Sequence, residues 1–179
     1  MKYSLKRQLQ LLERTTLTRA TTIRETHTHS TIATHPLYKS LAASATAVEV
    51  YSSKAIIQLH HAGNCISELV ITLDDETDSG GIWVDKIETL NAEGELDASC
   101  FKQGYAKQML TLLVQAADET QTPLVLIAAP EAHQLRQMPG LPDKDALAAL
   151  YSRYGFVVTS SNWAQIRMAR APKRKNSML

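Results

Sequence analysis

Apolar and polar residues along this chain recur at two spacings, one typical of helices and one typical of strands. From residue 104 to about residue 120, the apolar positions keep the three-and-four spacing of one helix face: Ala106, Met109, Leu110, Leu113 and Ala117. The same spacing recurs over residues 4–14 and 144–154. Asp143 precedes the last of these runs as a helix N-cap, and Gly155 follows it as a left-handed stop. The pattern predicts three amphipathic helices.

Runs rich in β-branched and aliphatic residues predict the strands, which we place at residues 54–61, 65–73, 81–90, 124–129, 156–159 and 163–170. The turn Gly63-Asn64 makes an antiparallel hairpin of the first two. Apolar residues do not alternate cleanly over 81–90, which indicates a β-bulge. Residues 124–129 are almost continuously apolar, as expected for a strand covered on both faces. The strand, helix and strand around residues 81–129 therefore predict a parallel pair with a right-handed crossover.

The length of 179 residues predicts one domain. We expect its core to span residues 54–171, with residues 1–53 adding a helix and a Thr-rich stretch to the same domain, and 172–179 forming a disordered basic tail. Residues 42–50 are Ala-rich and fit either a helix or a linker, and Pro36 is expected to break whatever precedes it.

Composition changes this picture mainly by exclusion. The chain is 44% hydrophobic and 21% charged, with a formal net charge of +1, which is ordinary for a soluble globular protein. The near-neutral charge argues against RNA or DNA contact through the Arg- and Thr-rich N-terminal part. The sequence has no run of eighteen apolar residues and no apolar segment after its basic start, so we expect neither a membrane span nor a secretory signal.

The cysteines and histidines suggest no metal centre. Cys65 and Cys100 lack metal-ligand spacing, and we expect them to be free thiols of a cytoplasmic protein. His27 and His29 would share one side of a strand, but no third ligand lies nearby in sequence. We therefore expect no metal.

The segment around Gly104 carries the strongest chemical signal. The helix that begins there has no Ser, Thr, Asp or Asn immediately before it and no acid in its first turn, so its N–H groups lack a side-chain partner. Lys102 and Lys107 flank this positive end, and glycine lets a ligand approach the backbone. The pattern fits either a phosphate seat or an ordinary loop-to-helix turn.

Two motifs in this order resemble the GCN5-related N-acetyltransferase (GNAT) family. Gly104-x-Ala106, after a strand and opening a helix, is similar to the end of that family's Arg/Gln-x-x-Gly-x-Gly/Ala motif. Tyr151-Ser-Arg-Tyr-Gly-Phe156 is similar to its later Tyr-x-x-x-Gly-Phe signature. The resemblance covers roughly residues 54–170. It implies an α+β fold of layered α/β type, with a mixed, mostly antiparallel sheet, a central parallel pair splayed at the acyl-CoA site, and helices on both faces.

The resemblance also implies an activity, namely transfer of an acetyl group from acetyl-CoA to a primary amine by direct attack. Acetyl-CoA would be held by the splayed strand and the helix start, at Ile87, Thr89, Leu90, Lys102, Gln103, Gly104, Tyr105, Ala106 and Lys107. The Tyr151 phenol would protonate the departing thiolate, and Glu88 would take a proton from the amine. A salt-bridged or surface Glu88 and a buried, carbonyl-bonded Tyr151 are the structural alternatives.

The acceptor and the partners are less defined by the sequence. His133 follows the C-terminal end of the strand at 124–129, where ligands gather in open α/β sheets, and is a candidate substrate contact. The amine acceptor itself is not specified, and a homodimer is left open. Phe101 stands where the family has Arg or Gln, and Glu93, Glu95 and Asp97 precede the motif. These residues favour the alternative of a catalytically inactive GNAT-like binding or structural module.

Overall fold

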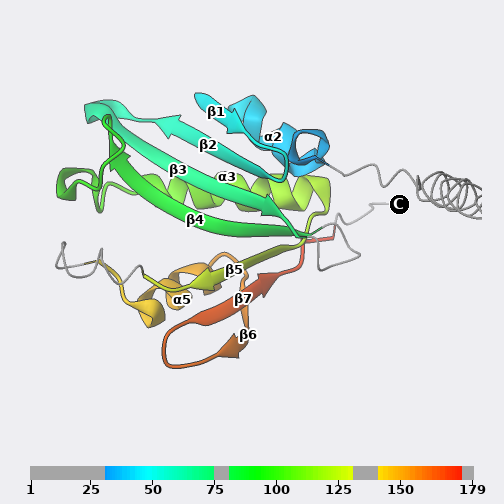
Figure 1. Ribbon diagram of the computed structural model, residues 1–179. Helices are drawn as coiled ribbons and strands as arrows, with labels where there is room; N and C mark the ends of the chain where they lie inside the picture. Colours follow the sequence, from blue (N-terminus) through cyan, green and yellow to red (C-terminus); the bar gives the residue numbers. More distant parts are fainter. Residues whose placement is uncertain (1–30, 75–80, 131–140, 175–179) are drawn as a thin grey trace, which may run out of the picture.

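A seven-stranded mixed sheet forms the frame of the protein (Figure 1). The structure, a computed structural model, describes residues 31–74, 81–130 and 141–174. Within these ranges the sheet has the order β1-β2-β3-β4-β5-β7-β6. The strands are β1 (Ala47–Val50), β2 (Lys54–His60), β3 (Cys65–Leu73), β4 (Ile82–Asn91), β5 (Leu124–Ala128), β6 (Val157–Ser161) and β7 (Ile166–Arg170). The helices are α2 (Pro36–Ser44), α3 (Tyr105–Thr120) and α5 (Lys144–Ser152), with short 3₁₀ turns η1 (Ile32–Thr34), η2 (Ala62–Asn64) and η3 (Ala98–Cys100).

The protein is therefore an α+β protein, and every neighbouring strand pair is antiparallel except β4 and β5. The mixed, mostly antiparallel sheet with a central parallel pair agrees with the sequence-based expectation. The predicted strands at 54–61, 65–73, 81–90 and 124–129 are β2, β3, β4 and β5.

The bulge expected in β4 is present at Asp85. Val70 of β3 pairs with Lys86, whereas the next residue, Ile71, pairs with Val84, so Asp85 has no residue opposite it in the β3 register. Because one extra residue reverses the alternation, the side chains on either side of Asp85 switch faces. Val84 therefore lies on the helix-covered face of the sheet, and Glu88 lies on the opposite face.

The parallel contact between β4 and β5 is short. It consists of Ile82–Val84 of β4 against Leu124–Leu126 of β5. From Asp85 to Asn91, β4 has no described strand on its β5 side. Figure 1 shows the two strands separating toward their C-terminal ends. The two strands are therefore parallel neighbours over three residue pairs only.

The described helices all pack on one face of the sheet (Figure 1). Apolar side chains of α3 meet alternate residues of the strands in one continuous core, which includes Leu69, Ile71, Met109, Leu113, Leu126 and Met168, each at most 2% exposed. Phe156, which precedes β6, joins the same core beside α5. The expectation of helices on both faces is wrong for the described residues, because the apolar stripes of α2, α3 and α5 all fit one continuous core.

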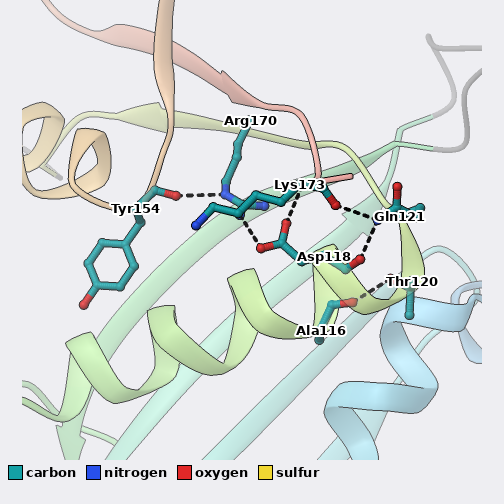
Figure 2. A network of polar contacts seen from close by, with 7 residues as sticks. All are labelled: Ala116, Asp118, Thr120, Gln121, Tyr154, Arg170 and Lys173. Carbon is teal, nitrogen blue, oxygen red and sulfur yellow. Dashed lines mark hydrogen bonds and ion pairs between the residues drawn. The ribbon is translucent and has the colours of Figure 1, made fainter. Parts of the chain in front are cut away.

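A partly buried ion pair links the end of β7 to the C-terminal part of α3 (Figure 2). Arg170, 3% exposed, donates from its guanidinium Nη2 to the Asp118 carboxylate at 2.7 Å. Its Nε donates to the Tyr154 carbonyl at 2.8 Å, and the backbone N–H of Lys173 donates to Asp118 at 2.7 Å. We call these four residues the Asp118–Arg170 clamp. It joins α3, the end of β7 and the turn after α5 at the end where β4 and β5 are paired.

The N-terminal part departs from expectation in one place. Pro36 begins α2 in the first-turn position that proline favours, and the 3₁₀ turn η1 ends before it at Thr34, as expected. Residues 47–50, expected to belong to an Ala-rich helix or linker, form the edge strand β1. The predicted helix at 4–14, the Thr-rich stretch to residue 30 and the end of the basic tail lie outside the described residues.

The two cysteines are not free thiols. Cys65, the first residue of β3, and Cys100, the last residue of η3, form a disulfide with a Cα–Cα distance of 5.7 Å. The expectation of free thiols is wrong because spacing along the chain does not reveal that β3 and the turn before α3 meet in space.

Candidate site at the start of α3

The start of α3 is half-buried and has no side-chain cap from its N-cap residue. Gly104 is its N-cap, with a φ of 84° in the left-handed region, and glycine has no side chain that could bond to the first free N–H groups. No acid lies in the first turn. Lys102 before the helix and Lys107 in its first turn are both exposed, so cationic side chains flank the positive end of the helix dipole. The helix start predicted at Gly104 is confirmed.

Three residues of the β2–β3 region hold Tyr105, the first residue of α3. The His61 ring stacks on the Tyr105 ring, with 3.9 Å between centroids and 10° between planes. The Ser67 hydroxyl donates to the Tyr105 carbonyl at 3.3 Å, and the Tyr105 hydroxyl donates to the Ala62 carbonyl at 3.3 Å. His61 Nε2 also bonds to the Ser67 hydroxyl. Burial, and secondarily the charge of His60, lowers the pKa of His61, which favours the neutral ring at physiological pH.

The same contacts connect the helix start to the unpaired stretch of β4. Ser67 is the strand partner of Thr89, so Thr89 is one strand away from the serine that bonds to Tyr105. Thr89 is 8% exposed and Leu90 6% exposed, while Ile87 is half-buried. The cofactor-binding residues proposed on β4 and on α3 therefore lie near one another, at the edge where β4 and β5 separate.

Glu88 lies on the face of the sheet that the described helices leave uncovered, and it is ion-paired. Its carboxylate is 2.7 Å from the Lys86 ammonium, which also lies 3.4 Å from Glu68. Gln58 donates to Glu68 at 3.0 Å. Burial acts to lower the pKa of Lys86, but hydrogen bonds and charges of Glu88 and Glu68 raise it overall. Lys86 therefore stays protonated, and the salt-bridged alternative describes Glu88 in this structure.

Tyr151 lies on α5 with its ring against the core, 5.9 Å from the Phe156 ring at an interplanar angle of 59°. Burial raises the pKa of its phenol, so the hydroxyl keeps its proton at neutral pH. Within the described ranges this hydroxyl has no hydrogen bond, so the carbonyl-bonded alternative does not apply there. The Tyr154 hydroxyl donates to the Lys107 carbonyl at 3.4 Å, which brings the Tyr151–Phe156 signature next to the first turn of α3.

The remaining predicted site residues are Gln103, Ala106 and His133. The Gln103 side chain is exposed and donates to the Ser99 carbonyl at 3.4 Å. Ala106 is half-buried in the first turn of α3. His133 lies outside the described residues. His61 was expected to be a surface or partly hydrogen-bonded histidine at a strand end, and its bond to Ser67 agrees with that. Sequence reasoning missed Ser67, because only the pairing of β3 with β4 places Ser67 under α3; the alternation of residues 65–69 was the one available signal.

The described ranges contain neither a membrane-spanning helix nor a metal-binding cluster. None of their helices has both the length and the apolarity needed to span a bilayer. No group of three or more His, Cys, Asp or Glu in residues 31–74, 81–130 and 141–174 is arranged to hold a metal ion.

Comparison with known proteins adds little to this geometry. No family model matches the chain, and no curated protein matches its sequence. A solved structure, described as the crystal structure of the anti-CRISPR protein AcrVA5, is similar with a TM-score of 0.40 and 14% sequence identity. The similarity covers 63% of this chain and 96% of that chain. The class that fold and site define is an α+β protein with a seven-stranded mixed sheet.

Proposed function

We propose that this protein is an N-acetyltransferase that moves an acetyl group from acetyl-CoA to a primary amine. One observation carries the proposal: the uncapped start of α3 and the stretch of β4 without a β5 partner lie at one edge of the sheet, connected through Ser67. A helix N-terminus favours phosphate, and an unpaired strand edge offers N–H and C=O groups to an amide-containing chain. Pyrophosphate joined to a chain with two amides is the chemistry of the CoA arm.

The proposed binding mode divides the site between two elements. The N–H groups after Gly104 would bind the pyrophosphate, with Lys102 and Lys107 adding charge. Backbone groups between Ile87 and Leu90 would bind the pantetheine amides. A glycine at residue 104 serves both the left-handed backbone and the close approach, since no described atom lies within 4 Å of the position that a β-carbon would take there.

The proposed reaction needs no covalent enzyme intermediate. The neutral amine nitrogen attacks the thioester carbonyl carbon, the C–S bond breaks, and an amide forms. Tyr151, whose pKa is raised by burial, donates its proton to the leaving thiolate. Glu88 accepts the amine proton directly or through water, and a β4 backbone N–H stabilises the charge on the carbonyl oxygen. Tyr151→Phe should lower the turnover number about 10²-fold or more, without changing the affinity for acetyl-CoA.

The experiment that tests binding is thermal unfolding with and without acetyl-CoA. At about a hundred times its dissociation constant, the ligand should stabilise the protein by about 2.7 kcal/mol, a rise in midpoint of about 5 to 10 °C for a domain of this size. Gly104→Glu should abolish the rise by placing a carboxylate at the helix start. Gly94→Glu is the matched control: Gly94 also has a positive φ, 80°, and open surroundings. No rise with the folded wild-type protein refutes binding at this site.

A catalytically inactive binding module is the second candidate, and specific observations favour it. Glu88 is engaged by Lys86 at 2.7 Å, and Phe101 stands where the resembled motif has Arg or Gln. Such a module would give the thermal rise with acetyl-CoA but release no CoA thiol with any of a panel of amines. Tyr151→Phe would then have no measurable effect.

A further inference from the structure

The loop that leads into α3, residues 92–103, makes only local hydrogen bonds among the described residues, and one covalent bond ties it to a distant strand. The Asn91 side chain accepts from the backbone N–H groups of Glu93 and Glu95 at 3.1 and 2.8 Å. Asp97 accepts from the Ser99 N–H at 2.8 Å. In the described part of the chain, every hydrogen bond made by residues 92–103 ends within residues 91–103.

The exception is the Cys65–Cys100 disulfide. Cys65 is fixed in the sheet, where it pairs with Asn91, and its carbonyl accepts from the His61 N–H at 2.8 Å. Cys100 ends η3, and only residues 101–103 separate it from Gly104. The bond therefore fixes the part of the loop that sets the left-handed backbone of Lys102 and Gly104, whose φ values are 58° and 84°.

We infer that this disulfide is a reducible cross-link that keeps residues 92–104 ordered and, through them, controls ligand affinity at the start of α3. The second half of the inference rests on the proposed function. Reduction by a dithiol adds two electrons and two protons, which yields the Cys65 and Cys100 thiols and the oxidised, cyclic form of the reductant. Helix α3 stays in place afterwards, because the contacts of Tyr105 with His61 and Ser67 do not involve the cysteines.

Because both cysteines are buried, reduction of the disulfide depends on local opening of the loop. The two cysteines are 5% and 2% exposed, so a reductant reaches the sulfur atoms only when the loop lifts. Since the loop has no other described polar tie to a distant residue, lifting it does not require the sheet to unfold. Binding by the reduced form must then order the loop again. The expected loss in affinity is at least about tenfold, because ordering even one backbone residue of this loop costs that much.

The test compares the oxidised full chain with the chain reduced by dithiothreitol and with the variant Cys65→Ser/Cys100→Ser. Hydrogen exchange followed by mass spectrometry should show faster exchange in residues 92–104 of the reduced and variant proteins. Peptides from β3 and from the C-terminal half of α3 should still exchange more slowly than residues 92–104, because their amides open only when the whole protein unfolds. The double variant must respond to dithiothreitol in neither region, which controls for other effects of the reductant.

Titration calorimetry with acetyl-CoA gives the second readout. Faster loop exchange together with an affinity weaker by at least about tenfold supports the inference. Unchanged exchange in residues 92–104 overturns it, and so does equal affinity in the two redox states. If acetyl-CoA binds neither form, the proposed function and the ligand half of the inference fail together, and the exchange data still decide whether the disulfide orders the loop.

Discussion

The Asp118–Arg170 clamp allows a stability prediction that is independent of any function. Asp118→Asn preserves the size of the side chain but removes the charge that faces Arg170 at 2.7 Å. Arg170 is 3% exposed and its NH1 group already has no hydrogen-bond partner within the described residues. The substitution therefore leaves a buried guanidinium without a compensating charge.

The expected cost follows from the burial of the two partners. Breaking a fully buried ion pair from one side costs about 3–5 kcal/mol. The Asp118 side chain is 25% exposed, so water can partly replace the lost charge, and we expect about 2.5 kcal/mol. For a chain of this length that corresponds to a fall in melting temperature of about 5–10 °C.

Equilibrium unfolding in urea, followed by circular dichroism, measures this cost. Glu119→Gln is the matched control, because Glu119 is the next residue of α3, is exposed and has no ion pair among the described residues. It should change the unfolding free energy by less than about 0.5 kcal/mol. A loss below about 0.5 kcal/mol for Asp118→Asn would refute the argument that the pair is desolvated and coupled.

The dependence on pH provides an internal check. Burial acts to raise the pKa of Asp118, but the hydrogen bonds from Arg170 and the Lys173 backbone lower it overall. Because the folded-state pKa lies below the unfolded value of about 3.9, the stabilisation is fully present above that pH and is lost as the pH falls through the folded-state pKa. The difference between wild type and Asp118→Asn should therefore shrink only in acid.

Further predictions concern the core, the helix start, the disulfide and the buried phenol. Leu113→Ala, at a fully buried position, should cost about 3 kcal/mol in urea unfolding, and a loss under about 1 kcal/mol would contradict the burial. Gly104→Ala should cost about 1–2 kcal/mol because φ is 84°; an equal or higher melting temperature would contradict it. Removing the Cys65–Cys100 bond, which spans 35 residues, should cost about 4 kcal/mol from the larger entropy of the unfolded chain, as measured by unfolding with and without dithiothreitol. In a spectrophotometric titration, Tyr151→Phe should remove a tyrosine that ionises above pH 10, since burial raises the pKa of that phenol; loss of one ionising at or below about pH 10 would contradict it.

Most helices and strands could be predicted from the sequence because the features that determine them, such as apolar periodicity and capping residues, lie within a few residues of each other. Helix α3 could be placed from its apolar stripe and from Gly104, and α5 from Asp143, whose side chain does accept from the Ala146 N–H at 2.8 Å. The bulge at Asp85 could be predicted because it interrupts an alternation visible in the sequence. Strand β1 was missed because its four residues are mostly exposed at the sheet edge and show no alternation of buried and exposed positions.

The candidate site was predicted only in part, because its supporting contacts depend on strand register. The sequence indicated Gly104 and Tyr151, which belong to local motifs. It did not indicate that Ser67 pairs with Thr89 and bonds to Tyr105, nor that Lys86 would engage Glu88. The disulfide was missed for the same reason, since 35 residues separate its cysteines and only the folded sheet brings them together.

The short parallel contact between β4 and β5 has a mechanical consequence. Three residue pairs and the Asp118–Arg170 clamp lie at one end of the sheet, and the two strands separate toward the other end. Strands β1–β4 and strands β5–β7 thus form two parts of the sheet that are paired at one end only, and the clamp lies beside that paired end, which would act as a pivot. Helix α3 has 16 residues, a length of about 24 Å. A rotation of about 5° at the pivot therefore moves the tips at the start of α3 by about 2 Å over that length.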